Sequence, residues 1–190
     1  MTGTVLTIDA LDIRVPVGTW TIDTAHSCVS FSVRHLMTRV RGTFDEFTGQ
    51  VTTAEDPAGC SATATIAMGS VNTGNRMRDD DLRSGAFFDV DRHPEMTFEG
   101  SGLTAADGGL VVPGTLTIRG IARAVALEAE FLGFDETGLQ GESRIGFSAA
   151  TTIRRSDYGV GAAAAEGQKI VVSDRVDIRL DVQAVLQSRS

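Results

Sequence analysis

The chain has 190 residues, a formal net charge of −8 at pH 7 and 42% hydrophobic residues. This length fits one domain, whose core is large enough to fold without a disulfide or a metal. The acidic balance argues against a nucleic-acid-binding protein, which normally carries a basic surface. We therefore expect no nucleic-acid partner. No apolar run approaches the ~20 residues of a membrane-spanning helix, so we also expect no stable membrane insertion.

The opening segment, MTGTVLTIDALDIRVPVG, has neither a basic leader nor the long apolar stretch of a secretion signal. We therefore expect a cytoplasmic protein. The two cysteines, Cys28 and Cys60, do not form a CxxC pair, and in a reducing compartment we expect both to remain thiols.

Alternation of apolar and polar residues, which is typical of strands, begins after the segment WTIDTAH. Val29, Phe31, Val33 and His35 fall on one face of the first such stretch. In the following VRGTFDEFTGQV the apolar phase shifts by one position near Asp45–Glu46. That shift predicts a β-bulge.

The alternation continues to residue 184, and the DGG sequence at 107–109 predicts a hairpin turn. The last stretch, VDIRLDVQA, alternates most regularly. The larger apolar residues that these patterns place on the inner face are Phe44, Ile66, Met68, Met96, Phe98, Leu116, Ile118, Leu127, Phe131, Ile145 and Phe147.

About eight such strands follow one another with short turns, which predicts an antiparallel sheet. A sheet with one apolar face avoids exposed edges by closing on itself. We predict an all-β protein, a single closed antiparallel β-barrel of about eight strands over residues 19–187. Residues 1–18 are then an N-terminal extension and 188–190 a tail. Small inward residues leave open whether side chains fill the barrel or a ligand cavity remains.

The motif NTGNRMRDDDLRSGAFFDV interrupts the strands and predicts a short helix near residues 75–86. Thr73 or Asn75 can cap its start, and aspartates in the first turn complement the helix dipole. Two interpretations remain open. The helix is either a lid that directs Phe87 and Phe88 into a cavity, with arginines at the rim, or a surface helix with Arg–Asp pairs.

Patterns of known catalytic chemistry are missing from the sequence. The GFSAA around Ser148 lacks the second glycine of G-x-S-x-G. His26 and His35 belong to no H-x-x-x-H pair, and no metal-ligand spacing is present. No phosphate-binding glycine motif occurs either. We therefore expect a protein that is not an enzyme and has no metal or cofactor.

The chain resembles the YceI-like family in six motifs that run in order from Trp20 to Ala184: WTIDTAHSCVSFSVRHL, GTFDEFTGQV, SVNTGNRMRDDDLRSGAFFDVDRHPEMTFEG, GTLTIRGIARAV, IGFSAATTIRRSDYGVG and VVSDRVDIRLDVQA. The resemblance implies a lipocalin-like barrel with an interior tunnel that binds polyisoprenoids, isoprenoid quinones or similar amphiphiles. The segment RDDDLRS at 78–84 matches the family pattern RDxxLRS. Asp81 departs from it, because the family often has a histidine there.

Pattern and resemblance together predict a protein that carries or sequesters a long-chain lipid or isoprenoid. Two alternatives are an enzyme of isoprenoid or polyketide metabolism with the barrel as reaction chamber, and a sequestrant of lipophilic antibiotics. A homodimer is left open. We expect the polar head group to meet His35, Arg76, Arg78 and Arg83. The residues expected to line the tunnel are Val29, Phe31, Val33, Phe44, Ile66, Met68, Phe87, Phe88, Met96, Phe98, Leu116, Ile118, Leu127, Phe131, Ile145 and Phe147.

Overall fold

The computed structural model describes residues 4–138, 141–162 and 172–187, and the expected tail at 188–190 lies outside them. The strands are β1 (Val5–Ile8), β2 (Ile13–Pro16), β3 (Gly18–Ile22), β4 (Cys28–His35), β5 (Thr38–Phe44), β6 (Phe47–Thr53), β7 (Ser61–Ala67), β8 (Val71–Asn72), β9 (Glu95–Ser101), β10 (Thr104–Ala106), β11 (Gly109–Ile118), β12 (Ile121–Asp135), β13 (Arg144–Arg154) and β14 (Val172–Leu186). The helices are α1 (Arg76–Arg83) and the short 3-10 turns η1 (Asp9–Leu11), η2 (Thr24–His26), η3 (Pro57–Gly59), η4 (Met68–Ser70) and η5 (Arg155–Tyr158).

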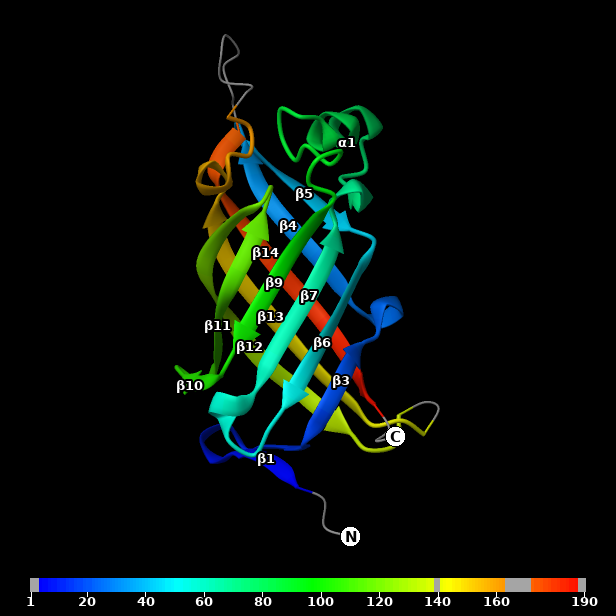
Figure 1. The fold of residues 1–190 in the computed structure, drawn as a ribbon, viewed down its shortest axis with the longest axis vertical. Coiled ribbons are helices and arrows are strands. Elements are labelled where there is room, and N and C mark those ends of the chain that lie inside the picture. Colours follow the sequence, from blue (N-terminus) through cyan, green and yellow to red (C-terminus); the bar gives the residue numbers. More distant parts are fainter. Residues whose placement is uncertain (1–3, 139–140, 163–171, 188–190) are drawn as a thin grey trace.

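Eight strands close into an antiparallel barrel (Figure 1). The order around the ring is β13-β12-β11-β9-β7-β6-β3-β14, and pairing of β13 with β14 completes it. The expected fold class, a closed antiparallel barrel of about eight strands with one short helix, is confirmed.

One position in the ring is shared by two strands that follow each other in the sequence, β3 and β4. The first part of β14 pairs with β4, and its last residues pair with β3. Strands β5 and β6 pair with β4 and β3 in turn. The predicted β-bulge at Asp45–Glu46 was wrong, because the chain there leaves one strand and begins the next.

Tight turns hold the hairpins of β11. Asp107 and Gly108, with φ of 50° and 81°, connect β10 to β11, which confirms the predicted hairpin turn. Arg119 and Gly120, with φ of 53° and 71°, connect β11 to β12. Two successive positive φ angles define a type I′ turn, whose twist matches that of the paired strands.

Side chains alternate across the barrel wall as the sequence pattern predicts. Val29, Ile66 and Leu116 are buried in the core, whereas Glu128, adjacent to the inward Leu127, is exposed. The buried residues form two clusters, one toward α1 and one toward the chain termini. The barrel thus has an apolar interior over its whole length.

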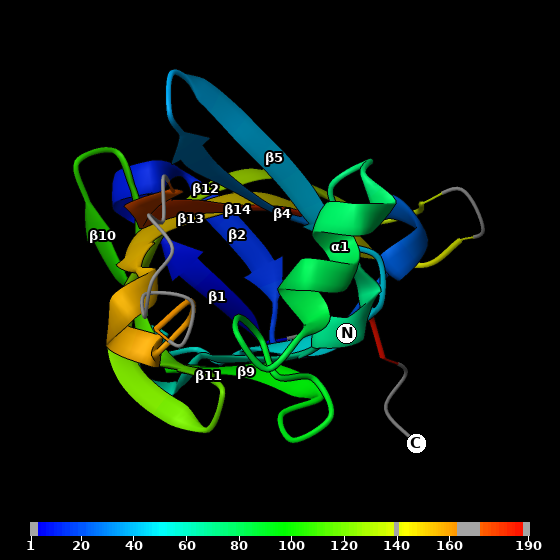
Figure 2. The same ribbon diagram turned by 90° about the horizontal axis from the view of Figure 1, so that it is seen from above.

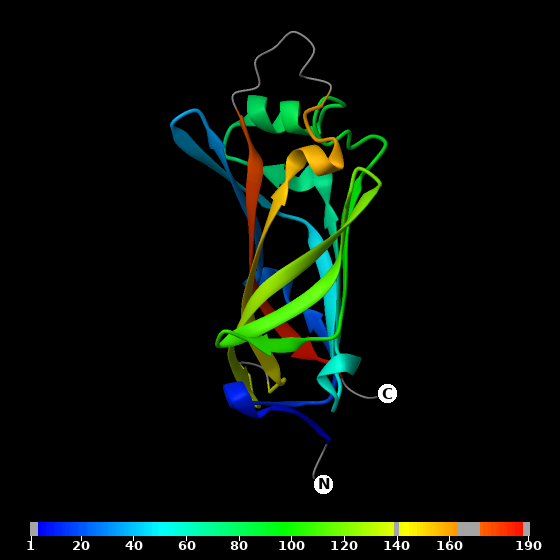
Figure 3. The same cartoon turned by 90° about the vertical axis from the view of Figure 1, so that its left-hand side faces the viewer.

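Strands β1 and β2 form a hairpin at the end of the barrel opposite α1 (Figures 2 and 3). Leu6, Ile8, Ile13 and Val15 of this hairpin are buried against Trp20 and the rest of the second cluster. This hairpin, which falls within the expected N-terminal extension of residues 1–18, is therefore part of the hydrophobic core and covers this end.

Among the described residues, no helix has both the length and the apolar composition that crossing a membrane would require.

Candidate ligand-binding interior

The interior holds an apolar cavity of about 100 Å³ near α1, which we call the upper cavity. The atoms that face it are apolar, so it offers a site for hydrocarbon. Its lining comes from the barrel wall, from α1 and from the segments after α1 and β13: Val29, Ser30, Phe31, Val33, Phe44, Met68, Leu82, Phe87, Phe88, Met96, Ile118, Ile153, Arg155, Tyr158, Val160, Val172, Val176 and Ile178.

A second cavity, the lower cavity, measures about 120 Å³ and lies under the β1–β2 hairpin. None of its lining residues also lines the upper cavity. They are Leu6, Ile8, Ile13, Val15, Val51, Thr52, Thr53, Cys60, Ser61, Ala62, Gly102, Leu103, Leu110, Val112, Leu127, Ala129, Phe131, Ile145, Phe147 and Ala149. The interior thus holds two cavities that have no lining residue in common.

The sixteen residues expected to line the tunnel all lie inside the barrel or, for Phe87 and Phe88, in the segment that follows α1. Four of them line the lower cavity: Leu127, Phe131, Ile145 and Phe147. Ile66, Phe98 and Leu116 are buried between the cavities and line neither. The upper cavity takes the remaining nine, Val29, Phe31, Val33, Phe44, Met68, Phe87, Phe88, Met96 and Ile118. Contact of these residues with a ligand stays a prediction.

A network of hydrogen bonds around the buried Asp79 fixes the start of α1. The Asn75 side chain caps the helix by accepting from the Arg78 backbone N–H at 3.1 Å. Asp79, 7% exposed, accepts from both the backbone N–H and the hydroxyl of Thr73, at 2.9 and 2.6 Å. Arg78 donates to the same hydroxyl at 2.7 Å. These bonds hold the helix so that Leu82 reaches the upper cavity.

The four residues expected near a head group line neither cavity. Arg83 donates to the carbonyls of Gly69 and Val71 at 2.8 and 2.9 Å. Arg78 likewise donates to the Thr73 carbonyl, and the Arg76 side chain is 96% exposed. His35 ends β4, opposite Val172. Two of the guanidinium groups therefore anchor α1, and a head-group role for the four stays a prediction.

Tyr158 and Arg155 are polar residues at the upper cavity that the sequence interpretation did not select. Tyr158 is 1% exposed, and its hydroxyl has no hydrogen-bond partner in the described part of the chain. Burial raises the pKa of this phenol, so it stays protonated near neutral pH. Arg155 donates to the carbonyls of Val160 and Ser173 at 2.8 and 3.2 Å. Both belong to the IRRSDYGVG motif, and this motif is the sequence signal that could have pointed to them.

Arg119, in the β11–β12 turn, links the segment after α1 and the segment after η5 to the barrel. Its guanidinium donates to the carbonyls of Phe87 and Gly159 at 2.8 and 2.7 Å. The same nitrogen thus joins the segment after α1 to the segment after η5. Phe87 and the residues near Tyr158 are held at the cavity by this link.

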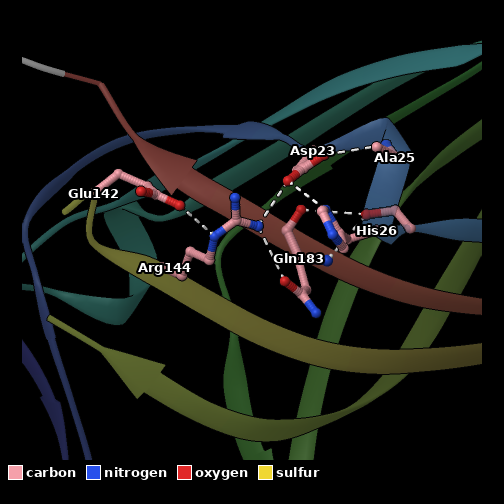
Figure 4. A network of polar contacts seen from close by, with 7 residues as sticks. Asp23, Ala25, His26, Glu142, Arg144 and Gln183 are labelled. Carbon is pink, nitrogen blue, oxygen red and sulfur yellow. Dashed lines mark hydrogen bonds and ion pairs between the residues drawn. The ribbon is translucent and has the colours of Figure 1, made fainter. Parts of the chain in front are cut away.

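Outside the barrel, a polar network joins the β3–β4 junction to β13 and β14 (Figure 4). Arg144 donates to Asp23 and to Glu142, both at 2.7 Å, and to Gln183 at 3.0 Å. His26 contacts Asp23 at 2.9 Å. The bond from Arg144 holds the pKa of Asp23 below its usual value. This network faces away from the cavities and serves to join the strands.

A hollow of about 1220 Å³ lies on the outer wall, where the polar side chains project. Three of its charged side chains bond to one another, since Asp177 accepts from Arg39 and Arg175 at 3.0 Å each. In the ranges that the structure describes, no group of three or more His, Cys, Asp or Glu side chains could hold a metal ion. Cys28 and Cys60 are free thiols, and burial raises the pKa of both.

Comparison with known proteins matches residues 20–184 to the YceI-like domain. The UPF0312 protein SA2479 of Staphylococcus aureus is 38% identical over 143 residues, which cover 74% of this chain and 81% of the relative. BcnA of Burkholderia cenocepacia superposes with a TM-score of 0.74 at 29% identity, covering 85% of this chain and 98% of BcnA. A polyisoprenoid-binding domain from Saccharophagus degradans shares the fold, with a TM-score of 0.67 at 18% identity and coverage of 90% and 99%.

Proposed function

Because the chain belongs to the YceI-like family, we propose that it binds a long-chain amphiphile, such as a polyisoprenoid or an isoprenoid quinone, and carries or sequesters it. The observation that carries this proposal is the apolar lining of the upper cavity. Burial of each CH₂ group contributes ~0.8 kcal/mol, so a hydrocarbon tail needs few polar contacts. The polyisoprenoid-binding domain of Saccharophagus degradans, which shares the fold, supports the same ligand class.

In the proposed complex the tail enters from the α1 end, and the polar end of the ligand stays near Tyr158 and Arg155. The opposite end is covered by the β1–β2 hairpin, in which Leu6, Ile8, Ile13 and Val15 are buried. The buried Tyr158 hydroxyl has no partner among the described residues, which is unfavourable, and a ligand carbonyl or hydroxyl that displaces the apolar groups between it and the cavity would satisfy it. Phe87 and Phe88 then lie against the first part of the tail.

The lining of the cavities supports binding more than the alternative of an enzyme. Among the described residues, the titratable side chains of this lining are Arg155 and Tyr158 in the upper cavity and Cys60 in the lower one. A reaction chamber needs a nucleophile or base with an orienting partner in hydrogen-bond reach. Arg155 and Cys60 bond mainly to backbone groups, so no such pair is formed.

A cavity-filling variant tests the proposal. Val176 lines the upper cavity, whereas Val111 lies on the outer face of β11. Val176→Phe should fill the cavity and weaken binding of a benzoquinone with four isoprene units at least roughly tenfold, because several CH₂ groups lose their place. Val111→Phe, the matched control, should bind as the unchanged protein does. Equal affinity of all three proteins in a fluorescence titration would refute binding in this interior.

A further inference from the structure

The two cavities are separated by a layer of side chains at the same height on several strands. Along β9, Met96 lines the upper cavity, Phe98 and Gly100 line neither, and Gly102, just after the strand, lines the lower one. The inward residues of this strand thus pass from one cavity to the other across two positions.

The same order occurs on β11, the neighbour of β9. Ile118 lines the upper cavity, Leu116 and Gly114 line neither, and Val112 lines the lower cavity. Leu116 pairs with Phe98 and Gly114 with Gly100, so the gaps on the two strands coincide. The cavities are therefore stacked along the barrel with a packed layer between them.

The Phe98 ring is held in this layer by two glycines. A Cβ atom at Gly100 would lie 2.8 Å from the ring, and one at Gly114 would lie 2.6 Å from it. Because these glycines face each other on paired strands, the ring lies across both of them. It is 8% exposed, and Ala64 on β7 and Leu116 on β11 are its cross-strand neighbours.

We propose that Phe98 is the partition of the interior and the residue that limits the length of the bound hydrocarbon chain. This inference rests on the proposed function. A short tail fits into the upper cavity without disturbing the ring. A longer tail reaches the lower cavity only after the ring has left the space over Gly100 and Gly114.

The test is a series of benzoquinones with one, two, four and eight isoprene units. The unchanged protein should gain affinity with each added unit until the tail meets the ring, and little thereafter. Phe98→Ala should continue to gain, so that it binds the eight-unit quinone at least roughly tenfold more tightly than the unchanged protein does. Phe147→Ala is the matched control, because it removes a side chain of the same size from the lining of the lower cavity and leaves Phe98 in place. This variant should keep the original length limit. The same length profile for all three proteins would overturn the proposal.

Xenon under pressure gives a measurement that does not depend on the lipid, because dry apolar cavities bind it. Crystals of the unchanged protein should show separate xenon sites in the two cavities, and Phe98→Ala should add one at the position of the ring. Phe98→Leu serves if the alanine variant does not fold. Xenon already continuous through the unchanged protein would overturn the partition. Xenon as expected, with no quinone bound by any variant, would support the partition and refute the proposed function.

Discussion

The hydroxyl of Thr53 forms hydrogen bonds with three polar groups near the buried Trp20. It accepts from the Trp20 indole at 2.9 Å and from the Gly18 backbone N–H at 3.1 Å, and it donates to the Pro16 carbonyl at 2.7 Å. Trp20 is completely buried, so its N–H has no access to water. One side chain thus joins β6, β3 and the end of β2.

Replacement of this hydroxyl should therefore be destabilising. Thr53→Val keeps the shape but leaves the Trp20 N–H unpaired, and we expect a loss of about 1–3 kcal/mol in the free energy of unfolding. Thr48→Val, on the exposed face of the same strand, should change it by less than about 0.5 kcal/mol. Urea unfolding followed by Trp20 fluorescence measures both. Equal stability of the two variants would contradict this role for Thr53.

Asp23 gives the molecule a pH-dependent contribution to stability. Its pKa is lowered by Arg144, so the folded state binds its proton less readily than the unfolded chain does. The contribution is complete above the unfolded pKa of about 3.9 and is lost as the pH falls through the folded pKa.

Asp23→Asn should lower the free energy of unfolding by about 1–2 kcal/mol at pH 7, because a charge-assisted bond between partly buried groups is lost. The difference from the unchanged protein should shrink as the pH falls below about 4. Asp181→Asn, an exposed acid with no ion pair in the described residues, is the control. A difference that stays constant from pH 7 to pH 3 would exclude the Asp23–Arg144 pair as its source.

Tyr158 allows stability and binding to be separated. Because its hydroxyl has no partner within the described chain, Tyr158→Phe should leave the free energy of unfolding unchanged or raise it by up to about 1 kcal/mol. The same variant should bind the four-unit benzoquinone roughly two- to tenfold more weakly, as one hydrogen bond is lost. A stability loss of more than about 1 kcal/mol would show that the hydroxyl already serves the folded protein.

At the scale of elements, the stability of α1 depends on the hydrogen-bond network at its start rather than on its length. A helix of 8 residues is marginal by itself. Asp79→Ala would leave the Thr73 N–H and hydroxyl without their acceptor, and we expect a loss of about 1–3 kcal/mol together with faster amide exchange across α1. Asp81→Ala, an exposed neighbour, should change neither. Unaltered exchange in the Asp79 variant would mean that other contacts hold the helix.

Sequence patterns located this helix but did not reveal the hydrogen bonds of its arginines. The expected span of 75–86 contains α1 at Arg76–Arg83, and Asn75, one of the two expected caps, is the cap. The closeness of arginine and phenylalanine in the sequence suggested one common site. In three dimensions the Phe87 and Phe88 rings reach the cavity, whereas Arg78 and Arg83 turn back to carbonyls of residues 69–73. Such tertiary hydrogen bonds leave no periodic signal.

The β1–β2 hairpin was missed for a different reason. Leu6 and Ile8 alternate before the turn, and Ile13 and Val15 alternate after it. Each pattern spans only a few residues, which is too short to distinguish a strand from a loop. Their burial becomes visible only when the hairpin lies across the end of the barrel.

At the scale of the whole molecule, the regular alternation predicted both the closed barrel and the inward side of its strands, because a strand has a period of two residues. The division of the interior could not be predicted in this way. It depends on the direction in which the Phe98 ring leans, toward one glycine two residues on and another on the paired strand. Cavity volume likewise follows from packing between strands that are distant in the sequence.

The most direct test of the account is native mass spectrometry of the protein after incubation with the four-unit benzoquinone and, separately, with the same benzoquinone without a tail. We predict a one-to-one complex with the prenylated compound that survives transfer to the gas phase, and none with the tail-free compound, because burial of the tail supplies most of the binding energy. Val176→Phe should show much less of the complex. Equal adducts with both compounds, or none with the prenylated one, would contradict a binding function of the apolar interior.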